Sequence, residues 1–447
     1  MDKRKFLKTS GALIAGSMFS DLIADENRGG PRKNWAGNYQ YKAERLDTPK
    51  SVGEVQSIIK NCQKAKALGA RHSFNSIADS TGDQVSLAEF KEIKLDPKSR
   101  TITVGAGVRY GDLAPVIDKA GYAVHNLASL PHISVAGACS TGTHGSGNKN
   151  GNLSTAVAAL EFVTADGKLV TLSRERDGER FRAAVVGLGG LGVITRMALD
   201  VLPRFDMRQV VYQNLPIGQL EHHLDEIFGS GYSVSLFTDW QNHQMTQVWV
   251  KSRVDAGSSA EPKRDFFGAK PATRKLHPIT GYPAENCTEQ LGIPGPWYER
   301  LPHFRMNFTP SSGDELQSEY FVPREKGYEA ILAIERLKDH ITPHLFVSEL
   351  RTIAADDLWM SQCYKRQAMT IHFTWKPQRA AVKTILPMIE DQLAPFGARP
   401  HWAKVFTMQR SRLQPLYPRL ADFRELLKQY DPGGKFRNEY LNMNIYA

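Results

Sequence analysis

The spacing of hydrophobic residues changes near residue 205, and this change restricts the fold more than any other feature of the chain. From Asn34 to about Phe205, short β-like runs alternate with helical stretches. Beyond that point strand-like segments predominate, with helices between them. We therefore predict an α+β protein with one domain over residues 31–205, a second over residues 206–400 and a C-terminal segment over residues 401–447.

The same periodicity places the individual elements. In the first domain it predicts helices over Ser51–Ala67 and Tyr110–Ala120 and strands over Thr101–Val104, Leu160–Thr164 and Val193–Leu202. In the second it predicts strands over Ser233–Trp240, Gln247–Lys251, Glu319–Val322, Leu345–Thr352 and Ala368–Trp375, and helices over Arg324–Asp339 and Gln378–Leu393. The stretch Asp255–Pro310 is expected to be irregular. From His401 onward we expect one more strand and a helix over Asp422–Gln429.

Residues 1–30 have the layout of an export signal. The basic string Lys-Arg-Lys-Phe-Leu-Lys over residues 3–8 precedes an apolar stretch, Gly11–Phe19, that is too short to cross a bilayer. The string is similar to a twin-arginine signal whose first arginine is replaced by lysine. We expect export to the periplasm, and a cytoplasmic protein with a weakly amphipathic leader remains the alternative.

Charge and cysteine content exclude several classes of function. The formal net charge is +10, but Lys and Arg are spread along the chain without a basic run interleaved with aromatic residues, so nucleic-acid binding is not expected. The four cysteines form no C-x-x-C pair, which argues against a zinc ribbon, and we expect no metal site. Stable membrane insertion is not expected either. The oligomeric state stays open, and a monomer is compatible with the sequence.

Residues 68–75, Leu-Gly-Ala-Arg-His-Ser-Phe-Asn, form the first candidate ligand-binding loop. Small and hydroxyl residues let backbone N–H groups approach a phosphate, and His72 would lie close to the bound group. Taken alone, His72 fits a hydrogen-bonded structural histidine better. The stretch Ser129–Gly147 changes this interpretation, because it holds four glycines and six Ser or Thr residues threaded with apolar residues. Such a stretch is more typical of a phosphate-binding wall than of a plain flexible loop.

The string Gly187–Gly192 matches the G-x-G-x-x-G pattern of nicotinamide dinucleotide binding. That site requires a strand before the glycines and a helix after them. Here a helical stretch, Phe181–Val186, precedes them and a predicted strand follows, so we reject this interpretation.

Polar residues two positions apart mark three predicted strands of the C-terminal half. Residues i and i+2 of a strand share a face. The sets are Glu349 with Arg351, His372 with Thr374, and Lys404 with its apolar neighbours Trp402 and Phe406. Each polar residue alone could belong to a structural network, but together they predict a polar pocket.

Several strings, taken together, resemble the vanillyl-alcohol-oxidase-type flavoproteins and, within them, the alditol oxidases. The resemblance runs from Asn34 to the C-terminus. Its strings are His72–Asn75, Ala128–Gly137, Thr141–Gly147, Ser233–Trp240, Leu301–Phe304 and Glu315–Tyr320.

The resemblance implies the two-domain fold of FAD-linked oxidases, with FAD bonded through His72 to the flavin 8α-methyl carbon. It also implies that the C-terminal segment returns to the flavin. The implied cofactor contacts are Gly69, Ala70, Arg71, His72, Ser73, Phe74, Asn75, Ser129, Ser134, Gly137, Thr141, Gly142, Thr143, His144 and Ile194. In the family, small residues often precede the linking histidine, and Arg71 departs from this pattern. A positive φ at this position would strain Arg71.

The resemblance also implies oxidation of a terminal alditol hydroxyl to an aldehyde, with hydride transfer to flavin N5 and reduction of O2 to H2O2. Lys404, His372 and Arg351 are the implied catalytic residues, and Ser129, Glu349, Arg351, Thr374 and Lys404 the implied substrate-binding residues. Two alternatives stay open. An aldonolactone oxidase or dehydrogenase would share the fold, and a non-catalytic flavin- or sugar-binding protein would lack turnover.

Overall fold

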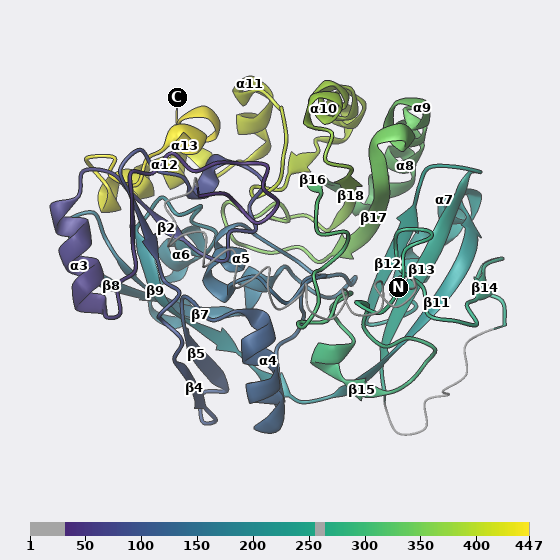
Figure 1. Ribbon diagram of the computed structural model, residues 1–447, viewed down its shortest axis with the longest axis horizontal. Coiled ribbons are helices and arrows are strands. Elements are labelled where there is room, and N and C mark those ends of the chain that lie inside the picture. Colours follow the sequence, from purple (N-terminus) through teal and green to yellow (C-terminus); the bar gives the residue numbers. More distant parts are fainter. Residues whose placement is uncertain (1–31, 255–263, 447) are drawn as a thin grey trace, which may run out of the picture.

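The computed structural model describes residues 32–254 and 264–446, and it divides into two sheet-based halves (Figure 1). The N-terminal half holds a five-stranded sheet of order β4-β5-β9-β7-β8 and a three-stranded sheet of order β1-β3-β2. The first sheet comprises β4 Ile93–Asp96, β5 Thr101–Gly105, β9 Val193–Asp200, β7 Val157–Val163 and β8 Leu169–Ser173, and the second β1 Arg45–Asp47, β3 Asp83–Ser86 and β2 Ala65–Leu68. The main helices of this half are α3 Val52–Asn61, α4 Tyr110–Lys119, α5 Val135–Ser140 and α6 Arg174–Val185, and β6 Tyr122–Ala123 pairs with β10 Leu202–Pro203.

The second half is built on a nine-stranded sheet that follows the path β14-β11-β13-β12-β17-β18-β16-β19, with β15 beside β11. Its strands are β11 Asp206–Pro216, β12 Ser233–Thr238, β13 Gln244–Arg253, β14 Lys270–Pro271, β15 Gly295–Pro296, β16 Leu316–Pro323, β17 Leu345–Ile353, β18 Ala368–Trp375 and β19 Arg399–Pro400. The helices of this half are α7 Leu220–Gly229, α8 Gly327–Glu335, α9 Lys338–Ile341 and α10 Arg379–Leu393. All of these strand pairings are antiparallel. The predicted α+β class is thus confirmed.

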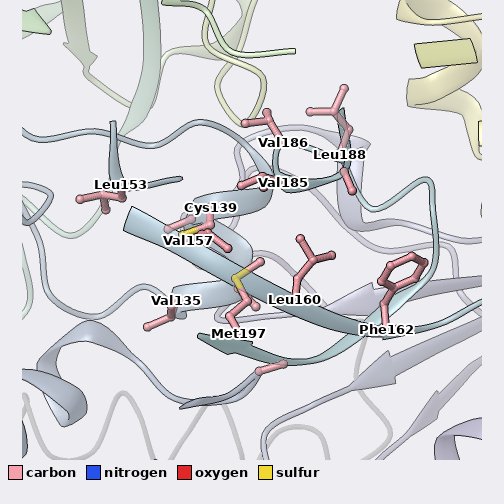
Figure 2. Packing of buried hydrophobic residues seen from close by; sticks show 14 of the residues in the cluster. Val135, Cys139, Leu153, Val157, Leu160, Phe162, Val185, Val186, Leu188 and Met197 are labelled. Atoms are coloured by element: carbon pink, nitrogen blue, oxygen red, sulfur yellow. The ribbon is translucent and has the colours of Figure 1, made fainter. Parts of the chain in front are cut away.

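Each half has its own hydrophobic core. In the first, β7 and β9 pack against α5, and Figure 2 shows Leu160, Met197 and Cys139 meeting there. Alternate residues of β9 are buried, as expected for a strand with one face on a core. In the second, α7, α8 and α10 lie along one face of the large sheet and bury residues such as Leu350 and Ile371 (Figure 1). The polar residues of the same strands therefore point to the opposite face.

The C-terminal residues belong to the first core although they follow the second in sequence. Trp402, Phe436, Tyr440 and Leu441 are all buried in the cluster that contains β7 and β9. Trp402 follows β19, Phe436 lies between α12 Leu420–Tyr430 and α13 Glu439–Asn444, and Tyr440 and Leu441 lie on α13; the short helix α11 Arg410–Leu413 precedes α12. The chain thereby returns to the border between the two halves.

Two predicted elements are wrong. The helix predicted over Ser51–Ala67 ends at Asn61, and Ala65–Leu68 is strand β2, paired in parallel with β3. The strand expected after His401 is absent from the described residues, because Lys404 N–H donates to His401 O at 3.1 Å and closes a turn. The glycine-rich string lies between α6 and β9, in the order that excludes a nicotinamide site. The predicted export signal lies outside the described residues, and no described helix is long and apolar enough to span a bilayer.

Candidate active site

A large cavity lies along the border of the two halves. It encloses about 1730 Å³ of space that no protein atom fills, part of it open to solvent. It is lined by residues 66–74, by residues of the 128–144 stretch, by Ile194 and by polar residues of the large sheet.

The loop before His72 adopts a strained backbone. Arg71 has φ 62°, a left-handed conformation that strains a non-glycine residue, as expected from the sequence for a positive φ here. Trp35 N–H donates to Arg71 O at 2.9 Å, and the Trp35 ring stacks on the His72 ring with centroids 4.8 Å apart. Burial, and the nearby charges of His132, Arg109 and Arg71, lower the pKa of His72 to about 3, so its ring is neutral at physiological pH.

The same loop is suited to hold a phosphate. Within the described residues, no protein atom accepts a hydrogen bond from the backbone N–H of Ala70, His72 or Ser73, although all three residues line the cavity. A Cβ added at Gly69 would lie 2.6 Å from Ser134 Oγ, so a side chain there would displace this hydroxyl from the wall of the cavity. Free N–H groups and hydroxyls on one wall are the donors that a pyrophosphate requires. The residues present therefore fit FAD.

Glu319 is the centre of the polar cluster on the other side of the cavity. Its Oε2 accepts from Lys404 Nζ at 2.7 Å and its Oε1 from Arg351 Nη2 at 2.7 Å, while His144 Nε2 lies 3.2 Å from Oε1. Burial alone would raise the pKa of Glu319, but the charges of Lys404, His144 and Arg351 outweigh burial and hold that pKa well below its usual range. The Glu319 side chain is completely buried, so it is a paired internal charge.

Strand register brings the other predicted residues to this centre. Glu319 on β16 and Glu349 on β17 both stand opposite His372 on β18. Lys404 Nζ lies 2.6 Å from His372 Nδ1, and His372 Nε2 lies 3.2 Å from Thr374 Oγ1. Burial and the charge of Lys404 lower the pKa of His372 to about 4, and burial also lowers the pKa of Lys404.

The Lys404 turn is attached directly to the His72 loop. Phe74 N–H donates to Ala403 O at 2.7 Å, and Asn75 Nδ2 donates to Lys404 O and Trp402 O at 2.8 Å each. These bonds fix the distance between the predicted flavin anchor and the polar cluster. The backbone that carries Lys404 is therefore positioned by the His72 loop, while the Lys404 side chain is held by the large sheet.

Most predicted site residues line the cavity, and two do not. Those that line it are Gly69, Ala70, Arg71, His72, Ser73, Phe74, Ser129, Ser134, Gly137, Thr141, Thr143, His144, Ile194, Glu349, Arg351, His372, Thr374 and Lys404. Asn75 is turned away because its amide holds the Lys404 turn. Gly142 has φ 68° and lies against Gln362 Oε1, so its role is in the backbone turn.

Sequence reasoning missed four residues of the polar cluster or its support. Glu319 and Gln317 line the cavity from β16, His303 lines it from the irregular segment, and Lys251 stands behind His303 on β13. The alternation Glu315, Gln317, Glu319 was the available signal for the first two.

His144, Glu319 and His401 each offer a metal-ligand atom, all within 4.8 Å of one another. Glu319 already pairs with Lys404 and Arg351, and two positive charges beside it disfavour a further cation.

Comparison with known proteins agrees with this arrangement. Family models described as FAD binding domain and as D-arabinono-1,4-lactone oxidase match residues 43–173 and 313–444. An alditol oxidase of Streptomyces sp. (strain IKD472 / FERM P-14339) is 47% identical over 91% of this chain and 97% of that protein. The chain belongs to the alditol oxidase family. The L-gulonolactone oxidase of Mus musculus is more distant, at 27% identity over 93% of this chain and 98% of that protein.

Solved structures show how widely the fold of this family member is shared. A cholesterol oxidase from B. sterolicum superposes with a TM-score of 0.73 at 14% identity, covering 92% of this chain and 96% of that chain. A xylooligosaccharide oxidase from Myceliophthora thermophila C1, in complex with xylobiose, superposes with a TM-score of 0.70 at 15% identity, covering 93% of each chain. At these identities the likeness establishes the fold alone. Together with its family, it identifies the chain as an FAD-dependent oxidoreductase.

The left-handed Arg71 yields a stability prediction for this family member. A non-glycine residue in this conformation destabilises the fold by roughly 1–2 kcal/mol. Replacement by glycine removes this strain, but the greater entropy of glycine in the unfolded chain offsets part of the stabilisation. We expect Arg71→Gly to raise the free energy of unfolding by about 0.5–1 kcal/mol in urea titrations. The matched control is Ala70→Gly. Ala70 has no positive φ, so this substitution should lower the free energy of unfolding. Equal losses in both variants would contradict the prediction.

Proposed function

We propose that this enzyme oxidises a terminal hydroxyl of an alditol such as xylitol or sorbitol and passes the electrons to O2, forming the aldose and H2O2. One observation carries the proposal: polar residues of β16, β17 and β18 and the Lys404 turn converge on the cavity that the His72 loop lines. Neutral and charged donors and acceptors set at fixed positions suit a polyol, which has a hydroxyl on every carbon.

The protein's part of the chemistry is proton transfer. Lys404 Nζ already donates to Glu319, and two arrangements of its short contact with His372 Nδ1 bear on proton transfer. A charged Lys404 donates to Nδ1 and leaves the proton of His372 on Nε2. A neutral Lys404 accepts from Nδ1–H and leaves Nε2 free to take a proton from the reacting hydroxyl. The lowered pKa of Lys404 favours access to this second, basic arrangement.

The remaining cluster residues bind and orient. Glu349, Arg351 and Gln317 hydrogen-bond the non-reacting hydroxyls, and Ser129, which accepts from Arg351 Nη1 at 3.2 Å, limits where the chain of the polyol lies. The bound FAD supplies the two-electron acceptor and its reoxidation by oxygen.

A substrate panel tests this proposal against its nearest alternative. The matches to L-gulonolactone oxidases and to the lactone-oxidase family model favour a lactone as the second candidate. Purified enzyme is assayed for peroxide with xylitol, sorbitol and gulonolactone at equal concentrations. Turnover of the polyols above the lactone supports the proposal, and turnover of the lactone alone overturns it. Failure of every polyol to bleach the flavin without oxygen would favour a non-catalytic binding protein.

We further propose a covalent bond from His72 to the 8α-methyl carbon of the flavin. The neutral, half-buried imidazole beside Trp35 has the lone pair that such a bond needs. Bond formation removes one hydrogen from the ring nitrogen and one from the methyl group, and O2 takes up both with their electrons as H2O2. Acid precipitation should leave a yellow pellet for the wild type and a yellow supernatant for His72→Ala. A colourless wild-type pellet would contradict the bond.

We also propose export through the N-terminal string, which supports placement in the periplasm. The support is the basic and apolar layout of residues 3–19. Fractionation of cells with and without Arg4→Gln tests it, and equal cytoplasmic retention of both proteins would contradict export.

A further inference from the structure

Lys251 and His303 form a buried pair behind Glu349, and the proposed reaction uses neither of them. Lys251 is only 1% exposed. Its Nζ lies 2.5 Å from Leu301 O, 3.1 Å from Pro302 O and 2.9 Å from His303 Nδ1. The other ring nitrogen of His303 lies 2.7 Å from Glu349 Oε1.

Glu349 determines which ring nitrogen of His303 carries a proton. Burial alone would raise the pKa of Glu349, but Arg351 and His303 outweigh burial and hold it well below its usual range. Glu349 is therefore a carboxylate, which accepts hydrogen bonds and donates none. His303 Nε2 must carry a hydrogen, because a bare nitrogen at 2.7 Å would repel the carboxylate oxygen.

Counting the hydrogens and acceptors around Lys251 Nζ in the same way gives the charge of the pair. If His303 is neutral, its Nδ1 is an acceptor, and Lys251 Nζ then faces three acceptors and needs three hydrogens, as an ammonium. If His303 is doubly protonated, a neutral Lys251 accepts from Nδ1 and donates to both carbonyls. In either arrangement the pair holds one positive charge, and a neutral pair leaves one of these contacts repulsive. Burial lowers the pKa of Lys251 to about 7 and that of His303 to about 4, so this charge is carried on Lys251 and is lost as pH rises above neutrality.

We infer that Lys251 and His303 are positioning residues that fix the Glu349 carboxylate toward the substrate cavity through the hydrogen bond from His303 Nε2–H to Glu349 Oε1. The inference rests on the proposed function in so far as Glu349 binds hydroxyls of a polyol. Their effect is exerted on binding, since Glu349 contacts non-reacting hydroxyls. A charge-assisted hydrogen bond is about twice as strong as a neutral one, so its loss weakens substrate binding markedly.

Steady-state kinetics of the holoenzyme test the pair. We expect Lys251→Met and His303→Leu each to raise KM for the polyol about tenfold, with kcat changed less than about twofold. His303→Gln, which keeps an N–H near the Nε2 position, should restore KM to within about threefold of the wild type. The matched control is Ser348→Ala, next to Glu349 but on the opposite strand face, where Ser348 accepts from Trp240 Nε1. It should leave KM unchanged.

A second measurement needs no substrate. In ¹⁵N-histidine NMR of the wild-type holoprotein, the His303 signals are assigned by their loss in His303→Gln. We expect a hydrogen on Nε2, with Nδ1 either hydrogen-bonded as an acceptor or protonated. An unprotonated Nε2, or a Lys251→Met variant with unchanged KM, would overturn the inference. If the wild type oxidises no polyol, the proposed function fails, while the NMR result still tests the hydrogen on Nε2 that the inference requires.

Discussion

Lys404→Met is expected to lower kcat by a factor of roughly 10²–10⁴, the range that a positioned acid–base group contributes. Methionine has nearly the length of lysine but neither donates to Glu319 nor exchanges a proton with His372 Nδ1. The measurement is the anaerobic rate of flavin bleaching at saturating polyol, which isolates substrate oxidation from reoxidation by oxygen. Lys376→Met is the control, because Lys376 is half-buried just beyond β18, away from the Glu319 cluster, and donates to Pro343 O.

The pH dependence distinguishes a proton carrier from a structural lysine. The basic arrangement exists only when Lys404 has lost its proton, so kcat/KM of the wild type should rise with pH through a pKa below the usual 10.5 of lysine. In Lys404→Met this rise should disappear. A wild-type profile that falls between pH 6 and 9, or a variant within about threefold of the wild-type kcat, would contradict the role of Lys404.

The sequence could predict this site where the signal is local. Glu349 with Arg351 and His372 with Thr374 follow the two-residue period of a strand, and both pairs line the cavity. Which strand lies beside which is not a local property. Glu319, His372 and Glu349 lie side by side across the sheet because β18 pairs with β16 on one side and with β17 on the other.

The two wrong predictions have the same cause: the periodic spacing of apolar residues continues past the point at which the backbone changes conformation. Apolar spacing after Ser51 continues to Cys62, and the chain then leaves the helix because Ala65–Leu68 pairs with β3. Trp402 and Phe406 alternate as in a strand, but the backbone of their segment bonds to β16 at only two points, from His401 N–H to Glu319 O and from Val405 N–H to Gln317 O. The turn between these contacts carries Lys404.

The residues that support the site from behind, Lys251 and His303, had the weakest signal in the sequence. Lys251 ends a predicted strand without a polar neighbour two positions before it, and its partner His303 comes from the irregular segment. Two residues 52 positions apart in sequence meet only through the tertiary fold.

Glu319→Gln is expected to lower the free energy of unfolding by about 3–5 kcal/mol at pH 7, the cost of removing one partner from a buried ion pair. Glutamine cannot balance the charges of Lys404 and Arg351, which remain buried beside it. The measurement is urea unfolding of the holoprotein followed by fluorescence. The control is Glu315→Gln, since Glu315 is equally buried but bonds to Gln317 and Ser312 instead of a cation.

The two carboxyl groups should differ in the direction of their pH dependence. The pKa of Glu319 is lowered in the fold, so its contribution is fully present above about pH 4.5, its ordinary pKa, and is lost as pH falls through the lower folded value. The deficit of Glu319→Gln should therefore shrink on acidification below pH 4.5. Burial raises the pKa of Glu315, so ionisation of Glu315 destabilises the fold at neutral pH and Glu315→Gln should match or exceed the wild type there. Equal deficits in both variants at pH 7 would mean that Glu319 acts as an ordinary buried polar group, without a net charge interaction with Lys404 and Arg351.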